Sequence, residues 1–135
     1  MRTETSHFWF GQFTSEEAYF DFLGENETYY EDEDVIEDEK YISEFAKSQN
    51  ENFLDHDFME SGFENEEVSF KEKFSPYSYS EKWITEAKER LVKQNQDPEK
   101  VNTVVFISKD QIEKPISIQN SKFELIYIGQ IEYEI

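Results

Sequence analysis

The segment Ser6 to Phe13 (SHFWFGQF) most constrains the fold, because aromatic residues occupy most of its positions. A strand with one solvated face alternates apolar and polar residues, whereas a strand covered on both faces is apolar throughout. We therefore predict a central strand here. Gly11 lies inside it, where a missing side chain allows another backbone or ring to approach closely.

A helix is predicted directly after this strand. Thr14 can form a capping box with Glu17, since the hydroxyl accepts from the Glu17 amide and the Glu17 carboxylate accepts from the Thr14 amide. Apolar residues then recur with the period of a helix, at Ala18, Tyr19, Phe22 and Leu23. Gly24 is the expected end of this helix.

A second, longer helix is predicted in the other half of the chain. Ser78 or Ser80 can cap it, and Asp97-Pro98 is expected to end it. Its apolar stripe consists of Trp83, Ile84, Ala87 and Leu91.

Strands are expected after this helix. Val101 to Ile107 is β-branched and apolar enough for an interior strand. Phe123 to Ile135 alternates, which predicts a strand with one wetter face, especially past Gly129. A short strand at Ile116 to Ile118 is expected before the Asn120-Ser121 turn. The apolar residues predicted on one face of the last strand are Phe123, Leu125, Tyr127, Ile131, Tyr133 and Ile135.

The order of elements predicts an α+β or α/β fold in one domain, residues 1–135, with helices packed against a small mixed sheet. An acidic helical or loop insertion is expected at about residues 25–67. Within it, a short helix is expected around Ile42, Phe45 and Ala46, and helical or turn structure around Phe53, Leu54, Phe58 and Phe63.

Composition favours a folded chain despite its charge. The net charge is −19, yet Leu, Ile, Val and Phe make up 34 residues, about 25%, above the level typical of disorder. Thirteen Phe, eight Tyr and two Trp can bury much area per residue. The chain has no cysteine, no signal-peptide pattern and no apolar run long enough for a membrane span, so the cytoplasm is the expected compartment.

The acidic residues are concentrated in one segment. Residues 25–67 carry seventeen carboxylates and two lysines, a net charge of −15, which leaves −4 for the rest of the chain. Such a field repels nucleic acid and anionic membrane and attracts a basic partner through a salt-sensitive encounter. We therefore expect a cationic protein as partner, and neither nucleic acid nor membrane. Solubility alone is the alternative explanation of the charge.

Motifs for catalysis or for cofactors are lacking. The two histidines, His7 and His56, are far apart and show no zinc-site spacing, and the acidic runs do not match an EF-hand loop. Asp55-His56-Asp57 could tune a base, but no nucleophile motif or phosphate-binding loop accompanies it. We expect no enzyme activity, no cofactor and no metal. Trp9 and Trp83 are expected as core anchors.

Three segments resemble the immunity protein 22 family of bacterial polymorphic toxin systems. They are HFWFGQFTSEEAYFDFL, SEFAKSQNENFLDHDFMESGF and SYSEKWITEAKERL followed by VNTVVFI, and the resemblance covers about His7 to Ile107. It implies a small cytosolic protein that binds the effector domain of a cognate toxin and protects the producing cell. The positions that would carry the family pattern are Trp9, Gly11, Asp55, Asp57, Glu60, Ser78 and Tyr79.

The expected partner is thus a basic toxin domain, with a nuclease as one candidate, since a nuclease groove that holds phosphates would accept an acidic protein. Charges would steer the encounter and aromatic side chains would anchor the complex. The candidate partner-binding residues are Tyr29, Tyr30, Glu31, Asp32, Glu33, Asp34, Glu37, Asp38, Tyr41, Asp55, Asp57, Phe58 and Glu60. Two alternatives stay open: an acidic nucleic-acid mimic that regulates a host DNA- or RNA-binding protein, and a hydrolase that uses Asp55, His56 and Asp57.

Overall fold

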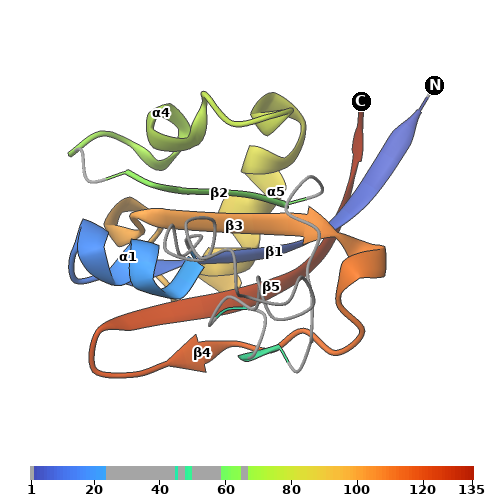
Figure 1. The fold of residues 1–135 in the computed structure, drawn as a ribbon. Coiled ribbons are helices and arrows are strands. Elements are labelled where there is room, and N and C mark those ends of the chain that lie inside the picture. The colour runs from blue at the N-terminus through green and yellow to red at the C-terminus, as the bar shows by residue number, and fades with distance from the viewer. Residues whose placement is uncertain (1, 24–44, 46–47, 50–58, 65–66) are drawn as a thin grey trace, which may run out of the picture.

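A computed structural model describes residues 2–23, 45, 48–49, 59–64 and 67–135 (Figure 1). The described residues form an antiparallel sheet in the order β2-β3-β1-β5-β4, with helices on both of its faces. The strands are β1 (Thr3–Phe13), β2 (Met59–Phe63), β3 (Thr103–Ser108), β4 (Ile118–Gln119) and β5 (Phe123–Glu134). The helices are α1 (Glu16–Leu23), α4 (Phe70–Phe74) and α5 (Ser80–Lys93), with short 3-10 turns η3 (Pro98–Lys100) and η4 (Lys109–Gln111). The predicted α+β class is confirmed, and the sheet is antiparallel rather than mixed.

The aromatic segment forms the central strand, as predicted. β1 pairs with β3 on one side and with β5 on the other. Phe8, Trp9 and Phe10 are all fully buried, because successive side chains enter opposite faces and both faces are covered. A Cβ at Gly11 would collide with the backbone carbonyl of Glu124 on β5. The close approach expected at this glycine is therefore confirmed.

Each face of the sheet has its own apolar core. On one face Phe8 and Phe10 pack with Trp83 of α5 and with α4. On the other face Trp9 and Phe13 pack with residues of α1. Trp9 and Trp83 are fully buried, which confirms both as core anchors. The predicted apolar stripes of the two helices also face these cores.

A β-bulge divides the last strand, and the prediction of one continuous apolar face was wrong. Phe8 lies opposite Gly129 and Trp9 opposite Tyr127, so Ile128 is an extra residue in β5. Gly129 has a φ of 102°, which favours glycine. The extra residue reverses the alternation. Phe123, Leu125 and Tyr127 therefore lie on the α1 face, whereas Ile131 and Tyr133 lie on the α5 face.

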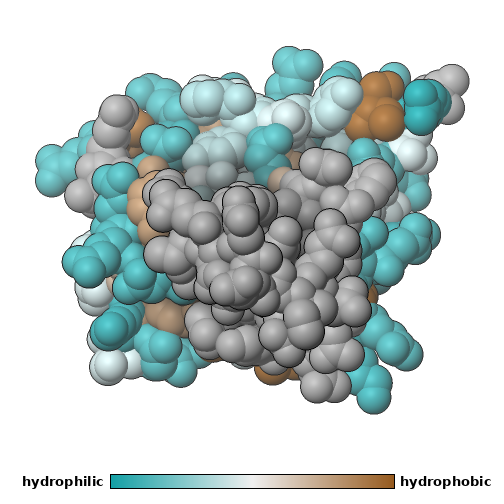
Figure 2. All heavy atoms as spheres, in the orientation of Figure 1, coloured by the Kyte–Doolittle hydropathy of each residue, from teal (hydrophilic) through white to brown (hydrophobic). Residues whose placement is uncertain are grey.

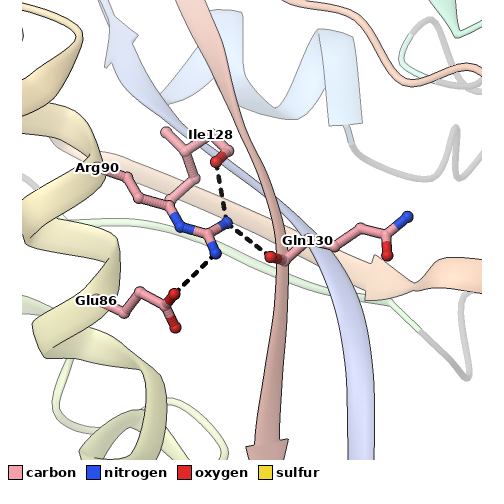
Figure 3. Close-up of polar contacts among 4 residues, drawn as sticks. All are labelled: Glu86, Arg90, Ile128 and Gln130. Atoms are coloured by element: carbon pink, nitrogen blue, oxygen red, sulfur yellow. Dashed lines mark hydrogen bonds and ion pairs between the residues drawn. The ribbon is translucent and has the colours of Figure 1, made fainter.

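Arg90 of α5 is bound to this bulge (Figure 3). Its Nη1 donates to the carbonyl oxygens of Ile128, at 3.1 Å, and Gln130, at 2.6 Å. Its Nη2 contacts Glu86 one turn earlier on the helix at 2.8 Å. The guanidinium thus satisfies carbonyl groups that the irregular strand leaves turned toward α5, and it ties the helix to the sheet.

The helix ends differ from those predicted. α1 is capped by Ser15, whose Oγ accepts from the Ala18 amide, and not by Thr14, whose amide donates to the Lys122 carbonyl. α5 ends at Lys93, before Asp97-Pro98, because Asn95 adopts a left-handed conformation with a φ of 62°. Local sequence allowed either Thr14 or Ser15 as the cap of α1, and the Thr14 amide is instead bonded to Lys122 just before β5.

Residues 59–63 form an edge strand, where helical or turn structure had been expected. The sequence MESGF has no strand alternation, and its pairing with β3 is a tertiary contact. Two residues described before this strand, Phe45 and Gln49, also make tertiary contacts, and Phe45 belongs to the core on the α1 face. Phe45 packs edge-on against Trp9 at 5.1 Å, and the Gln49 side-chain amide bonds both backbone groups of Ile116.

A short strand before β5 is present, but it comprises Ile118–Gln119 rather than the expected Ile116 to Ile118. The expected turn is confirmed, because the Asn120 side chain accepts from the amides of Lys122 and Phe123. Figure 2 shows one face of the molecule, where hydrophilic side chains surround isolated hydrophobic ones. Among the described residues, none of the helices has the length and apolar character that crossing a bilayer requires.

Candidate functional site

The connection between α4 and α5 is clamped to the edge strand by two glutamates. Glu60 of β2 accepts two hydrogen bonds from Ser78, one from the amide at 2.8 Å and one from the hydroxyl at 2.7 Å. The Ser78 carbonyl in turn accepts from the Trp83 indole at 2.9 Å. Ser78 is therefore held both by the sheet and by the helix that follows it.

The second clamp involves Tyr77. Its hydroxyl donates to Glu64 at 2.9 Å, and its ring end occupies the place that a side chain at Gly62 would need. Burial and the Glu64 hydrogen bond raise the pKa of Tyr77 far above the usual tyrosine value. The phenol therefore stays protonated and remains a donor to Glu64.

Tyr79 lies between Ser78 and the first residue of α5, and its backbone conformation is unusual. Its backbone is left-handed, with a φ of 57°, and its side chain makes no capping bond to the helix. A non-glycine residue in this region costs about 1–3 kcal/mol, and such residues concentrate at functional sites. Although aromatic, Tyr79 is 49% exposed, and its ring centroid lies 6.0 Å from that of Tyr133.

A hollow of about 260 Å³ opens beside Tyr79 at the end of the sheet, and we call it the Tyr79 hollow. Its walls come from β1, β2, β3, β5 and the α4–α5 connection, and they include Glu4, Ser6, Glu60, Phe106, Tyr79 and Tyr133. Glu4 accepts a hydrogen bond from Ser108 at 2.8 Å, and the Ser6 and Tyr133 hydroxyls lie 3.0 Å apart. Of the residues that the structure describes, the charged ones that line this hollow are Glu4 and Glu60.

The electrostatics of the Tyr79 hollow are negative. The pKa of Tyr133 is raised, first by burial and then by the nearby carboxylates of Glu4 and Glu60, while the Ser6 hydrogen bond acts in the opposite direction. Such a site favours a cation and disfavours a phosphate or carboxylate.

The comparison with protein-family models decides the family. The model described as immunity protein 22 matches residues 7–134. The chain belongs to the immunity protein 22 family. This match extends the resemblance beyond Ile107 to the end of β5. Neither the comparison with curated proteins nor that with solved structures found a match.

Two of the segments that carried the family resemblance meet in the structure. Glu60 of the middle segment bonds Ser78 of the later one, next to Tyr79, whereas Trp9 and Gly11 lie in the core. Glu60 is the one candidate partner-binding residue within the described ranges. The others lie outside them: Tyr29, Tyr30, Glu31, Asp32, Glu33, Asp34, Glu37, Asp38, Tyr41, Asp55, Asp57 and Phe58.

Sequence reasoning missed Glu4 and Tyr133. Glu4 lies opposite Tyr133 in the β1–β5 pairing, so the two side chains share a face of the sheet. Residues 4, 60, 79 and 133 come from four distant segments, and no spacing rule connects them. The alternation predicted that Tyr133 lies on the apolar face of the last strand. It did not predict that Tyr133 lies beside two carboxylates.

His7 is buried, and both of its ring nitrogens are hydrogen-bonded within the fold. Its Nε2 donates toward the carbonyl oxygens of Lys109 and Ile112, at 3.2 and 3.1 Å, so its Nδ1 accepts from the Tyr127 hydroxyl at 2.8 Å. Burial lowers the pKa of this imidazole. Within the described ranges, no group of three or more His, Asp or Glu side chains is placed to hold a metal ion.

Proposed function

We propose that this member of the immunity protein 22 family neutralises a cognate bacterial toxin by binding its effector domain without catalysis, through an acidic surface. The family match over residues 7–134 carries the immunity role. The net charge of −15 on residues 25–67 supports the acidic mode of binding, because a field of this sign selects a basic partner.

The mechanism that follows is steric. Carboxylates steer the encounter with a basic toxin domain, and a nuclease is a fitting example because its groove holds phosphates with Lys and Arg. Once docked, the immunity protein occupies that groove and excludes the substrate. Exposed rim charges contribute little to the lifetime of such a complex, so aromatic side chains provide its anchors. Binding in the cytoplasm would protect the producing cell.

The hydrogen bonds of three polar side chains in the described fold support a non-catalytic role. The His7 imidazole is engaged at both ring nitrogens, and Glu60 and Glu64 are engaged by Ser78 and Tyr77. The hydrogen bonds of these three side chains position the backbone. Around them, among the residues that the structure describes, no base without a hydrogen-bond partner lies beside a nucleophile, which is the arrangement that covalent or general base catalysis requires.

The test is coexpression with the effector domain encoded by the neighbouring toxin gene. We expect the immunity protein to restore growth of cells that make this domain, and the two purified proteins to form a stable one-to-one complex by calorimetry. His56→Ala should protect as well as the parent, because inhibition requires no base. Failure of the parent to protect or to bind would reject the proposal, and loss of protection in His56→Ala would favour the hydrolase alternative.

A pull-down from a lysate that lacks the neighbouring gene product examines the other alternative. A regulator of a host DNA- or RNA-binding protein should still retain that protein under these conditions. We expect no stoichiometric host partner.

A further inference from the structure

We propose that the Tyr79 hollow receives a lysine or arginine side chain of the toxin, so that Tyr79 is an anchor of the complex. This inference rests on the proposed function for the identity of the partner. The chemistry of the hollow itself, an exposed aromatic ring beside two carboxylates, does not depend on it.

The size of the hollow fits a single side chain. Its volume of about 260 Å³ lies below the roughly 300–1,000 Å³ typical of small-molecule sites. Its walls combine the rings of Tyr79, Tyr133 and Phe106 with the carboxylates of Glu4 and Glu60. A cation that enters can lie against an aromatic face and near a carboxylate at once, which is the arrangement that binds guanidinium and ammonium groups well.

Tyr79 also lines a second hollow, and the charges that line the two hollows differ. The second hollow, of about 380 Å³, is lined by Lys71 as well as Glu81, so the opposite charges of these two side chains offset each other. Within the described ranges, no basic residue lines the Tyr79 hollow. The chain as a whole carries −19, so a basic partner is attracted before contact and the hollow then selects the positive side chain.

Tyr79 is held in place before any partner arrives. The residue on its N-terminal side is fixed by Glu60 and by the Trp83 indole, and the residue on its other side, Ser80, donates its hydroxyl to the Ser75 carbonyl. Its own carbonyl accepts the Lys82 amide at the start of α5. An exposed aromatic ring on a backbone fixed in this way loses little freedom on binding, which favours affinity.

The first experiment uses a small probe and needs no toxin. The full chain is titrated with N-acetyl-arginine amide, and with N-acetyl-citrulline amide as its neutral isostere, while NMR follows the tyrosine side chains. We expect millimolar binding of the arginine compound that shifts Tyr79 and Tyr133 and weakens with salt. Tyr79→Asn should abolish the shift of Tyr133, because asparagine tolerates the left-handed backbone and lacks the ring. Equal responses to the two compounds, or shifts elsewhere, would overturn the proposal.

The second experiment measures affinity for the neighbouring effector domain. Tyr79→Asn should raise Kd about tenfold or more, as expected for an aromatic anchor, whereas Tyr79→Phe should change it less than about threefold. Glu4→Gln keeps an acceptor for Ser108 and should raise Kd severalfold at low salt only. Its control is Glu89→Gln, which removes one charge from an exposed position of α5. Thermal unfolding of each variant verifies the fold.

The outcomes separate the two proposals. If the parent binds the toxin domain and Tyr79→Asn binds equally well, the toxin-anchor role of the hollow is wrong and the proposed function stands. If the parent does not bind the toxin domain, the proposed function and the toxin-anchor role both fail, and the arginine titration still decides whether the hollow binds cations.

Discussion

The end of the Tyr77 side chain fills the space that a Cβ at Gly62 would occupy, so any larger residue at position 62 would have to displace the Tyr77 ring. The hydroxyl of the same tyrosine bonds Glu64 two residues further along the chain. This contact places the connection that carries Tyr79 over β2. The position of Tyr79 therefore depends on a residue that is seventeen positions away in the sequence.

Gly62→Ala should lower the free energy of unfolding by about 1–3 kcal/mol, because an added methyl group forces the Tyr77 ring out of place. Denaturant unfolding measures it. A double-mutant cycle supplies the control: in a Tyr77→Ala background the same alanine should cost much less, since its neighbour is gone. An equal cost in both backgrounds would show that the strand itself, and not Tyr77, requires glycine.

Arg90→Met should lower the free energy of unfolding by about 1–2 kcal/mol, because the Ile128 and Gln130 carbonyls lose their shared donor while the side-chain stem is retained. Glu86→Gln is the matched control. It removes an exposed pair between positions one turn apart and should cost less than about 0.5 kcal/mol. If both variants were equally destabilised, the ion pair would be the stabilising contact and the bulge would not need the guanidinium.

Stability should fall as pH decreases below about 6.5, through His7. Burial lowers the pKa of its imidazole in the folded chain from the usual 6.5, so the unfolded chain binds more protons below that pH. The contribution is present above 6.5 and is lost as pH falls toward the folded value. Denaturant unfolding between pH 5.5 and 8 measures the slope. His7→Gln should flatten it, and His56→Gln, the control, should retain it; an unchanged slope in His7→Gln would assign the effect to other groups.

Neutralising Glu31, Asp32, Glu33 and Asp34 to Gln or Asn should slow association with the toxin domain severalfold at low salt. This deficit should shrink near 0.5 M salt, where the screening length is about 4 Å. Stopped-flow kinetics measures both rates. The control neutralises four carboxylates elsewhere, with the same change in net charge: Glu89, Asp110, Glu124 and Glu132. Parental association of the first variant at low salt would mean that the acidic run serves solubility.

Replacing Tyr29 and Tyr30 by Ala should have the opposite kinetic signature. Aromatic anchors act mainly on the lifetime of a complex, so dissociation should become faster while association stays nearly unchanged. The same stopped-flow experiment measures it. A change confined to the association rate would assign these tyrosines to steering instead.

Patterns with a strong local period predicted their elements well. The aromatic residues of β1 predicted a strand buried on both faces. The apolar stripe from Trp83 to Leu91 predicted that one side of α5 packs against an apolar surface. Both follow from side-chain spacing and the hydrophobic effect alone. The edge strand β2 was missed because MESGF has no alternation, and its partner β3 lies about forty residues further along the chain.

The sequence by itself determined the class of fold, its two tryptophan anchors and a strong negative charge concentrated in residues 25–67, since these depend on composition and on short-range periodicity. It also predicted Glu60 as a site residue. Only the tertiary structure decided that Glu60 bonds Ser78, that Arg90 binds a bulge, and that Glu4 and Tyr133 join Tyr79 around one hollow. Those relations depend on strand pairing between distant segments, where a single extra residue such as Ile128 turns every following side chain to the other face.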